Sequence, residues 1–448
     1  MDTTLWNNVA NFNIDGPVSE YGFITRLQNE NFWTVNFACE AIAEYKKFMY
    51  LAAVSDGMVS PSDVVDIVWH QHLIFTQSYN NFCSLLGKQI AHIPSTHNRN
   101  DFSTFKTATE RTKKLYLENF GPQPVHIWGY ANIYQPLGME TSPLSMANIC
   151  SVGVLLVMLA FIMAYYFLSP LYITIGNPYF IEGYLLIAIC GFIIVNFYNY
   201  VKLNAIVSQW PKDAFIFKLS ALELVYLQKN NIVPVIHGAV NQLILAGNIT
   251  ILENGRFRVK DAHHDEPVLY CVLQTISINP NADYPAIVNL LKYKPAFNKT
   301  SRAMDAFTNY VSSSKKFVEL FILNFSIFSI MFLLGAVRLA TGIVRDKPVT
   351  QIAIVLAMCL AFAVLNLHRL STAIGTVALP KYYSKNIVYQ SDAHNQWDWK
   401  YFLLGDSVFV SAFVPLTTTF NNSDGSFSST DSSSSCGSGG SCGGCGGD

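Results

Sequence analysis

Four long apolar stretches dominate this chain of 448 residues. They cover residues 147–169, 180–200, 317–337 and 349–367. Each has the length of about 20 residues that a helix needs to cross the hydrocarbon of a bilayer. One such stretch could be a buried helix of a soluble protein, but four of them in two closely spaced pairs indicate an integral membrane protein. The sequence therefore predicts two transmembrane hairpins, with the lipid bilayer as a binding partner.

The composition agrees with a membrane protein. Hydrophobic residues make up 51% of the chain and charged residues only 13%, against roughly 25% charged residues in ordinary soluble domains. The net charge of −1 provides no basic field that would attract nucleic acid, so we expect no nucleic-acid partner. The first thirty residues lack the basic and apolar segments of a signal peptide, which favours a cytoplasmic start of the chain.

Basic residues near the span ends predict the orientation. The segment between the second and third spans carries Lys202, Lys212, Lys315 and Lys316 near its ends, and such residues mark the cytoplasmic face. The short loop 338–348 holds three further basic residues and argues against this orientation. We predict a multi-pass protein of the cell inner (plasma) membrane with both termini in the cytoplasm.

Two carboxylates near span ends raise the question of transport. Glu182 and Glu319 both lie within three residues of the start of a predicted span. A carboxylate deep in a bilayer would indicate an ion or proton pathway. Their position favours an interfacial role instead, and a transporter stays an alternative only if one of them is deeply buried.

Residues 1–130 predict a small all-α domain. A periodic apolar run covers residues 33–54 and indicates a long helix. Ser60 is expected to cap the next helix, with Pro61 at its first position. A further helix over residues 76–86 should stop at Gly87, and the last one should cover residues 102–119.

Histidines concentrate in this domain. Asp66 and His70 are four residues apart and share one face of a helix, whereas His70 and His72 point about 200° apart. One interpretation is a zinc or iron site formed by Asp66, His70, His72 and His92, since imidazole and carboxylate groups suit these metals. In the other interpretation the residues are structural, and His70 and Trp69 close the helical bundle.

The same segment carries a family resemblance. Residues 65–73 read VDIVWHQHL and are followed by Ser78, Tyr79, Cys83, Gly87 and His92. This pattern resembles the D-x-V-W-H-x-H signature of the glycine-rich domain-containing protein family, which also has a downstream tyrosine and cysteine and a later histidine. The resemblance covers roughly residues 20–120. Where the family often has acidic residues after the last histidine, this chain has Ile93-Pro94-Ser95, so an acidic metal ligand is missing there.

Residues 213–312 predict a second domain between the two hairpins. Ser220 and Glu223 form a capping box at the start of a helix over residues 219–228. A second helix over residues 233–246 follows, and Asn254-Gly255 then lies between two β-rich runs, a strong hairpin signal. The order helix, helix, hairpin predicts a winged-helix-like α+β domain. Its second helix has no Lys or Arg, which favours a protein-interaction module over DNA binding.

A second resemblance begins at about residue 145. Its residues are Leu219, Glu223, Tyr226, Leu227, Ala239, Leu243 and Gly247. This spacing resembles that of a bacterial family of uncharacterised membrane proteins, which place such a region between pairs of spans and end in Cys/Gly-rich tails. The chain departs from the family's Gly-Gly pair with Lys229-Asn230-Asn231. The resemblance implies no catalytic residue.

The C-terminal part divides into two segments. Residues 370–420 contain an apolar stretch, 401–416, interrupted by Asp406 and Pro415, and we expect a strand-rich or interfacial segment. Residues 421–448 form a Ser/Gly/Cys tail that cannot bury enough surface to fold. The tail ends with Cys436, Cys442 and Cys445, and metal capture, thiol chemistry and a passive linker are the three open interpretations.

The sequence thus predicts a mainly α membrane protein with four transmembrane helices. An all-α N-terminal domain, a winged-helix-like middle domain and a disordered tail complete it. The leading functional hypothesis is a non-enzymatic membrane-anchored scaffold or adaptor with unidentified protein partners. The alternative is a metal-dependent enzyme acting through Asp66, His70, His72 and His92.

Overall fold

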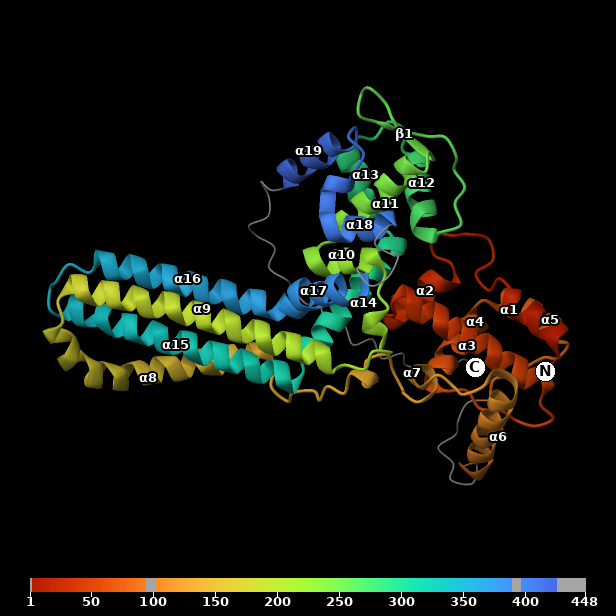
Figure 1. Cartoon of the computed structure of the whole chain (residues 1–448), viewed down its shortest axis with the longest axis horizontal. Coiled ribbons are helices and arrows are strands. Elements are labelled where there is room, and N and C mark those ends of the chain that lie inside the picture. The colour runs from red at the N-terminus through yellow and green to blue at the C-terminus, as the bar shows by residue number, and fades with distance from the viewer. Residues whose placement is uncertain (1, 94–101, 389–395, 425–448) are drawn as a thin grey trace, which may run out of the picture.

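The computed structural model describes residues 2–93, 102–388 and 396–424. The chain is mainly helical, and its elements fall into an elongated four-helix bundle and a group of smaller helices at one end of it (Figure 1). We call that end of the bundle the domain end and the opposite one the far end.

Four helices are long and apolar enough to cross a membrane, as predicted. They are α8 (Met146–Thr174), α9 (Asn177–Gln209), α15 (Lys315–Val344) and α16 (Thr350–Ala373). Within each pair the helices are antiparallel, and the two connecting turns, residues 175–176 and 345–349, both lie at the far end (Figure 1). Every other described element is connected along the chain to the domain end of one of these four helices. The polar part of the chain therefore gathers on one side. Glu182 and Glu319 are both exposed on the helix bundle.

A single arginine closes the far end of the bundle. The Arg338 guanidinium donates to the backbone oxygens of Tyr172 and Ile175 and to Asn177 Oδ1, the last two at 2.9 and 2.7 Å. The last carbonyl groups of a helix have no partner within it, and Arg338 satisfies those at the end of α8. Arg338 is one of the three basic residues of loop 338–348 that argued against the predicted orientation. Its side chain therefore has a structural role at the end of α8.

The described part of the N-terminal domain is all-helical, as predicted. Its elements are α1 (Thr3–Asn11), α2 (Phe23–Asn31), α3 (Val35–Val54), α4 (Asp63–Ile74), α5 (Thr76–Leu86), α6 (Phe102–Phe120), α7 (Val125–Trp128) and the 3-10 turn η2 (Gln135–Leu137). Gly87 ends α5 with a φ of +69°, a conformation that favours glycine.

The expected cap of α4 was wrong by two residues. The helix begins at Asp63, and Ser62 Oγ, not Ser60, accepts a hydrogen bond from Val65 N at 3.3 Å. The Ser60 backbone N–H donates instead to Thr112 Oγ1 on α6 at 2.9 Å. A tertiary contact thus ties Ser60 to α6, and the cap moves to the next serine.

The middle domain keeps the predicted order of elements. It contains η3 (Phe215–Phe217), α10 (Ala221–Lys229), α11 (Val233–Leu245), β1 (Ile249–Ile251), β2 (Phe257–Val259), α12 (Pro267–Ile278), α13 (Tyr284–Leu291) and α14 (Pro295–Ser312). The Ser220–Glu223 capping box is present. The strands pair antiparallel with Ile249 opposite Val259, and the turn between them contains Gly255 at a φ of +76°.

The C-terminal segment is helical, so the expectation of a strand-rich segment was wrong. Its elements are two π-helical turns, η4 (Ile374–Ala378) and η5 (Ser384–Val388), separated by α17 (Leu379–Tyr383), followed by α18 (Trp397–Leu404), the 3-10 turn η7 (Gly405–Val408) and α19 (Val414–Asp424). Residues Trp397 and Tyr401, four apart, stack at 5.5 Å on α18, a helical spacing that competes with a strand pattern.

Within this segment, α18 and α19 pack on the middle domain, whereas η4 and α17 also contact α9 of the bundle. Tyr401 Oη donates to Pro234 O, and Val410 N donates to Asn241 Oδ1, both at 2.9 Å and both to α11. Phe413 is fully buried against Tyr284 of α13, with ring centroids 5.2 Å apart. The apolar character of residues 401–416 is therefore used for packing on protein. Cys436, Cys442 and Cys445 lie outside the described residues.

Candidate functional site

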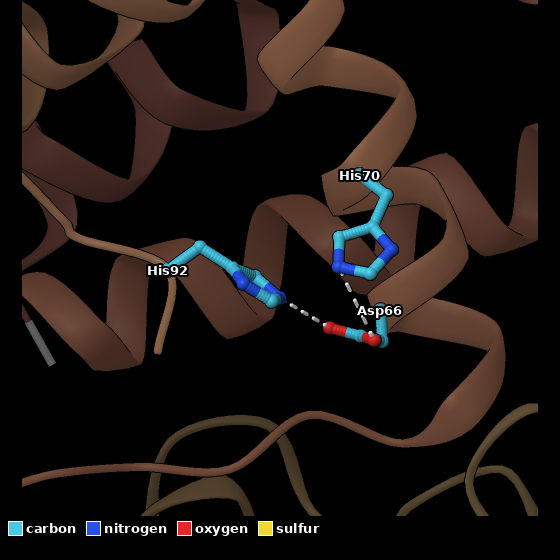
Figure 2. Close-up of side chains that lie close together, drawn as sticks. All are labelled: Asp66, His70 and His92. Atoms are coloured by element: carbon cyan, nitrogen blue, oxygen red, sulfur yellow. Dashed lines mark hydrogen bonds and ion pairs between the residues drawn. The ribbon is translucent and has the colours of Figure 1, made fainter. Parts of the chain in front are cut away.

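Three of the four predicted ligands come together on the N-terminal domain. Asp66 and His70 lie one turn apart on α4, and His92 comes from the segment that follows α5 (Figure 2). His92 Nε2 is 2.9 Å from Asp66 Oδ1, and His70 Nε2 is 3.8 Å from Asp66 Oδ2. The three ligand atoms lie within 4.8 Å of one another. The carboxylate of Asp66 thus contacts both imidazoles, whose ring centroids lie 4.4 Å apart.

The cluster is half open to solvent. The His70 side chain is 57% exposed, and that of Asp66 is 34% exposed, while His92 packs edge-on against Trp69 with ring centroids 4.6 Å apart. A cavity of about 170 Å³ lies beside the cluster. Its lining includes Asp66, His92, Ser60, Ser62 and Asp63, so polar groups face this space.

The cluster has a donor set that suits zinc or iron. A tetrahedral ion with ligands at about 2.0–2.1 Å places the ligand atoms about 3.3 Å apart. The 2.9 and 3.8 Å separations involve the two different oxygens of Asp66, and one ligand atom from each of the three residues lies within 4.8 Å of the others. Two imidazoles and one carboxylate leave further coordination positions open, and these would face the polar cavity. The same contacts also account for a histidine pair held by one carboxylate without an ion.

His72 lies apart from the cluster. Its ring is fully buried, with Nδ1 2.8 Å from Tyr45 Oη and Nε2 3.1 Å from Ser78 Oγ. Burial lowers the pKa of His72 to about 4, because desolvation disfavours the charged imidazolium. Both ring nitrogens are occupied within the core, so His72 is a structural residue and not part of the site.

The predicted structural role of His70 is also not observed. The Trp69 indole is buried and donates to Tyr79 Oη at 3.1 Å, and that hydroxyl donates to Ile90 O. This chain of hydrogen bonds ties α4 to α5 and to the segment that carries His92. Trp69 therefore closes the bundle as expected, whereas His70 points outward.

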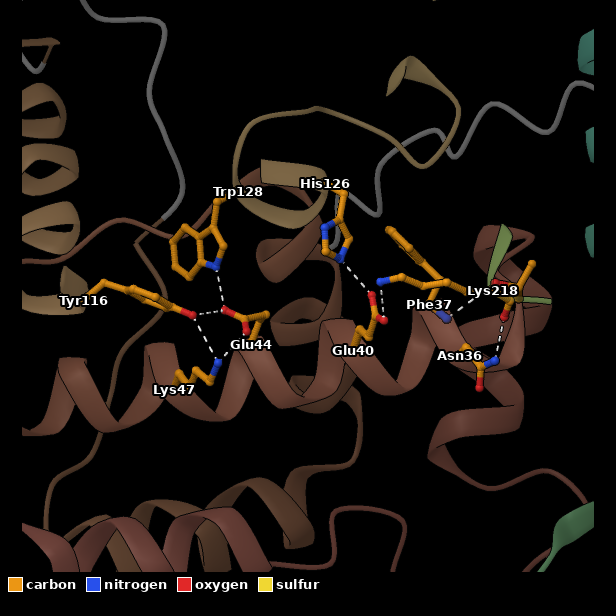
Figure 3. A network of polar contacts seen from close by, with 10 residues as sticks. Asn36, Phe37, Glu40, Glu44, Lys47, Tyr116, His126, Trp128 and Lys218 are labelled. Carbon is orange, nitrogen blue, oxygen red and sulfur yellow. Dashed lines mark hydrogen bonds and ion pairs between the residues drawn. The ribbon is translucent and has the colours of Figure 1, made fainter. Parts of the chain in front are cut away.

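A carboxylate on α3, which the sequence did not single out, is buried in the N-terminal domain. Glu44 accepts hydrogen bonds from Tyr116 Oη at 2.6 Å, from Trp128 Nε1 at 2.7 Å and from Lys47 Nζ at 2.7 Å (Figure 3). Only 5% of the Glu44 surface is exposed. The pKa of Tyr116 is raised mainly by burial and further by its hydrogen bond to Glu44. The cluster joins α3, α6 and α7. The spacing of Glu40, Glu44 and Lys47 along one helix face was the one available hint.

One turn earlier on α3, a second carboxylate connects the two domains. Glu40 pairs with His126 of α7 at 2.7 Å and with Lys218 of the middle domain at 2.6 Å (Figure 3). Burial alone would raise the pKa of Glu40, but the hydrogen bonds from His126 and Lys218 outweigh it and lower that pKa. Asn36 Nδ2 also donates to Lys218 O at 2.5 Å.

Further contacts hold the same interface. Glu223, the capping residue of α10, accepts a hydrogen bond from Val35 N at the start of α3 at 2.9 Å, so one carboxylate serves two helix N-termini. Lys294 pairs with Glu20 at 2.9 Å, and α2 packs along α14. The N-terminal and middle domains are therefore one packed unit at the domain end of the bundle (Figure 1).

Ionisable groups are buried within this interface. Lys299 of α14 is 5% exposed, and burial lowers its pKa despite the attraction of Glu266, Glu223, Cys39 and Asp15. Burial also raises the pKa of Glu223. These opposite directions have one cause, because a low dielectric environment disfavours both charged forms.

Comparisons with known proteins concern the N-terminal domain alone. Residues 25–112 match the UCP032817-like family. A segment of 91 residues is 30% identical to glycine-rich domain-containing protein 1 of Arabidopsis thaliana, and it covers 19% of this chain and 11% of that protein. No solved structure shows significant similarity to the chain. The matched residues 25–112 contain Asp66, His70 and His92, so the candidate site lies within the region that is similar to the UCP032817-like family.

Proposed function

We propose that this chain is a membrane-anchored scaffold or adaptor. The single observation that carries this proposal is the packing of the N-terminal domain, the middle domain and the C-terminal segment into one unit at the domain end of the bundle (Figure 1). The ion pairs of Lys218 with Glu40 and of Lys294 with Glu20 fix the two domains relative to each other. A composite surface held in a fixed position against a membrane suits the assembly of other proteins.

Several finer features belong to the same proposal. The middle domain is a winged-helix-like module used for protein contacts, and the chain from about residue 145 onward is related to a bacterial family of uncharacterised membrane proteins with Cys/Gly-rich tails. In a DNA-binding winged helix, the residues of the second helix read the DNA. The corresponding helix α11 is instead buried against the domain and the C-terminal segment, which supports a function without nucleic acid. Residues 1–130, 213–312 and 370–420 are its cytoplasmic segments.

We also propose that the protein lies in the cell inner (plasma) membrane with both termini in the cytoplasm. The basic residues Lys202, Lys315 and Lys316 at the domain end support this orientation. An epitope inserted after Asp346, in the far-end turn, should bind antibody on intact cells, and an epitope at the C-terminus should bind only after permeabilisation. The opposite pattern would reverse the orientation.

The scaffold is tested by quantitative affinity purification of the full chain from its source cells. The double variant Lys218→Glu/Lys294→Glu places like charges across the domain interface, and Lys229→Glu, at the exposed end of α10, is the matched control. A scaffold should retain a stoichiometric set of partner proteins in the wild type and the control and lose it in the double variant. Absence of any stoichiometric partner in the wild type contradicts the proposal.

The second candidate function is a metal-dependent enzyme centred on Asp66, His70 and His92. The observation that favours it is the meeting of these ligand atoms within 4.8 Å beside a polar cavity. A bound zinc or iron ion would supply Lewis-acid activation of water or substrate there, and the chain's own Ser60, Ser62 and Asp63 would orient a polar ligand. His72, predicted as a fourth ligand, takes no part.

Metal binding is tested by equilibrium dialysis of the full chain against Zn²⁺ and Fe²⁺. One equivalent should bind to the wild type and to His126→Ala, whose histidine pairs with Glu40 away from the cluster. Binding should fall in His92→Ala and Asp66→Asn. Equal binding in all four proteins contradicts this site.

A further inference from the structure

A second cavity, with a mixed polar and apolar lining, lies at the domain end of the helix bundle. It has a volume of about 430 Å³ and lies between α9, the end of α16 and the π-helical turn η4. Its polar lining comprises Asn196, Asn199, Tyr200, Asn204, Asn366, Arg369, Thr372 and Thr376. This density of amide and hydroxyl groups is unusual for helices that could cross a membrane, since lipid leaves such groups without partners.

The cavity is electropositive. Arg369 is the charged residue of its lining, which contains no Asp or Glu, and its side chain is exposed. Among the described residues, no ion pair involves its guanidinium. Lys381 of α17 lies near the same cavity, with Nζ 4.3 Å from the ring centroid of Tyr200. The charge arrangement thus suits an anionic group, which Arg can bind with two parallel hydrogen bonds.

The depth of the cavity matches the headgroup layer. The predicted hydrocarbon span of α9 ends at Tyr200, and that of α16 ends at residue 367, so the lining residues straddle both boundaries. Tyr and basic residues gather at this level of a bilayer. The asparagine side chains of Asn196 and Asn366 each donate to a carbonyl of their own helix, which leaves their amide oxygens as acceptors for a hydroxyl-bearing ligand.

A separate apolar cavity lies between α8, α15 and α16, with Phe192 as its lining residue from α9. It has a volume of about 340 Å³. Phe192, one turn before Asn196 on α9, and Leu367, next to Asn366 on α16, are among its lining residues. On both helices this cavity lies farther from the domain end than the mixed one. The two cavities share no lining residue, so a ligand with its polar head in the first cavity would place an apolar tail along the outer surface of α9 and α16, which is apolar over the predicted spans.

We infer that this cavity is a binding site for an anionic phospholipid of the leaflet next to the domains. Arg369 binds the phosphate, the asparagine and threonine groups bind a hydroxyl-bearing headgroup, and an acyl chain lies along the apolar surface of α9 and α16. The π-helical turn η4 forms one wall and packs on the middle domain, with Gly375 close to Leu227 of α10. A lipid here would contact the element that joins the bundle to the domains.

The test is native mass spectrometry of the delipidated full chain, titrated with phosphatidylglycerol, phosphatidylcholine or soluble glycerol 3-phosphate. The wild type should bind phosphatidylglycerol, and Arg369→Gln should weaken that binding about tenfold, as expected for one lost charged contact. The matched control Arg345→Gln removes the same charge from the far-end turn and should bind as the wild type does. Phosphatidylcholine has no headgroup hydroxyl and no net charge, so it should bind the wild type more weakly than phosphatidylglycerol does.

Thr376→Val is the second variant, because it keeps the charge and the size of the side chain while it removes a hydroxyl group from the cavity. It should weaken phosphatidylglycerol binding severalfold and leave the thermal unfolding of the lipid-free protein unchanged. Equal loss of affinity in Arg369→Gln and Arg345→Gln would overturn the site in favour of general charge attraction. Glycerol 3-phosphate that binds as tightly as phosphatidylglycerol would overturn the assignment to a lipid.

Discussion

Asn199 and Asn324 donate hydrogen bonds to each other through their side-chain amides inside the helix bundle. Both bonds measure 2.8 Å, and the pair joins α9 to α15 where both side chains are buried. The second Asn324 N–H bonds to Leu320 O of its own helix. In hydrocarbon the alternative to such a pair is an amide without partners, so each asparagine depends on the other.

The first prediction concerns this pair. Asn324→Leu leaves the Asn199 amide unpaired and should destabilise the bundle by about 1–2 kcal/mol. The double variant Asn199→Leu/Asn324→Leu should cost less than the sum of the two single variants, because no polar group then stays buried alone. The free energy of unfolding is measured in mixed micelles for the wild type, the two single variants and the double variant. Strictly additive losses would contradict the pairing.

The second prediction separates two neighbouring histidines. His72→Ala opens a cavity in the core and removes the contacts with Tyr45 and Ser78, so it should destabilise the protein by about 2–4 kcal/mol. His70→Ala changes an exposed side chain and should shift stability by less than about 0.5 kcal/mol. Denaturant unfolding checks both values. Metal affinity should follow the opposite order, falling in His70→Ala and not in His72→Ala.

The third prediction is a pH dependence caused by His72. Its pKa lies near 4 in the folded protein and near 6.5 when exposed, so the unfolded state binds a proton that the folded state excludes. The free energy of unfolding therefore has its full value above pH 6.5, and the part that depends on neutral His72 is lost as the pH falls toward 4. Unfolding free energies at pH 7 and pH 5 should differ more in the wild type than in His72→Gln. Parallel profiles would contradict a neutral, buried His72.

The fourth prediction concerns the buried carboxylate of α3. Glu44→Ala leaves the Tyr116 hydroxyl, the Trp128 indole N–H and the Lys47 ammonium without their shared acceptor, and it should cost about 3–5 kcal/mol. Tyr116→Phe removes one of the three donors and should cost about 1 kcal/mol. Thermal unfolding followed by circular dichroism compares the two. Equal costs would mean that the remaining contacts of Glu44 contribute little.

The fifth prediction concerns the C-terminal segment. A chain that ends at residue 396 loses the contacts of Tyr401, Val410 and Phe413 with the middle domain and exposes a large apolar surface, so it should aggregate on purification. A chain that ends at residue 424 keeps all of these contacts and should stay monodisperse. Size-exclusion chromatography in detergent distinguishes them. A well-behaved chain ending at 396 would contradict the packing role.

Local features of this fold could be predicted from the sequence. The four apolar stretches determine four long helices because the length requirement concerns neighbouring residues only. The Ser220–Glu223 capping box and the Asn254-Gly255 turn are likewise determined within a few residues. The α4 cap failed because a distant residue, Thr112, binds Ser60.

The tertiary part of the candidate site could be predicted only in part. The helical spacing paired Asp66 with His70 and separated His70 from His72, as observed. The approach of His92 depends on α5 folding back on α4, which no local pattern encodes. The contacts of Lys218 with Glu40 and of Glu223 with Val35 join residues more than 170 positions apart, and single-sequence periodicity carries no information about such pairs.

The shortness of the two far-end turns limits which molecules can bind the protein from that side. Residues 175–176 and 345–349 are the described connections there, and Arg338 holds the first of them closed. A soluble enzyme, antibody or toxin on that side would have few residues of these turns to bind. Among the described residues, the surface that remains at the far end is formed by the ends of the four helices themselves.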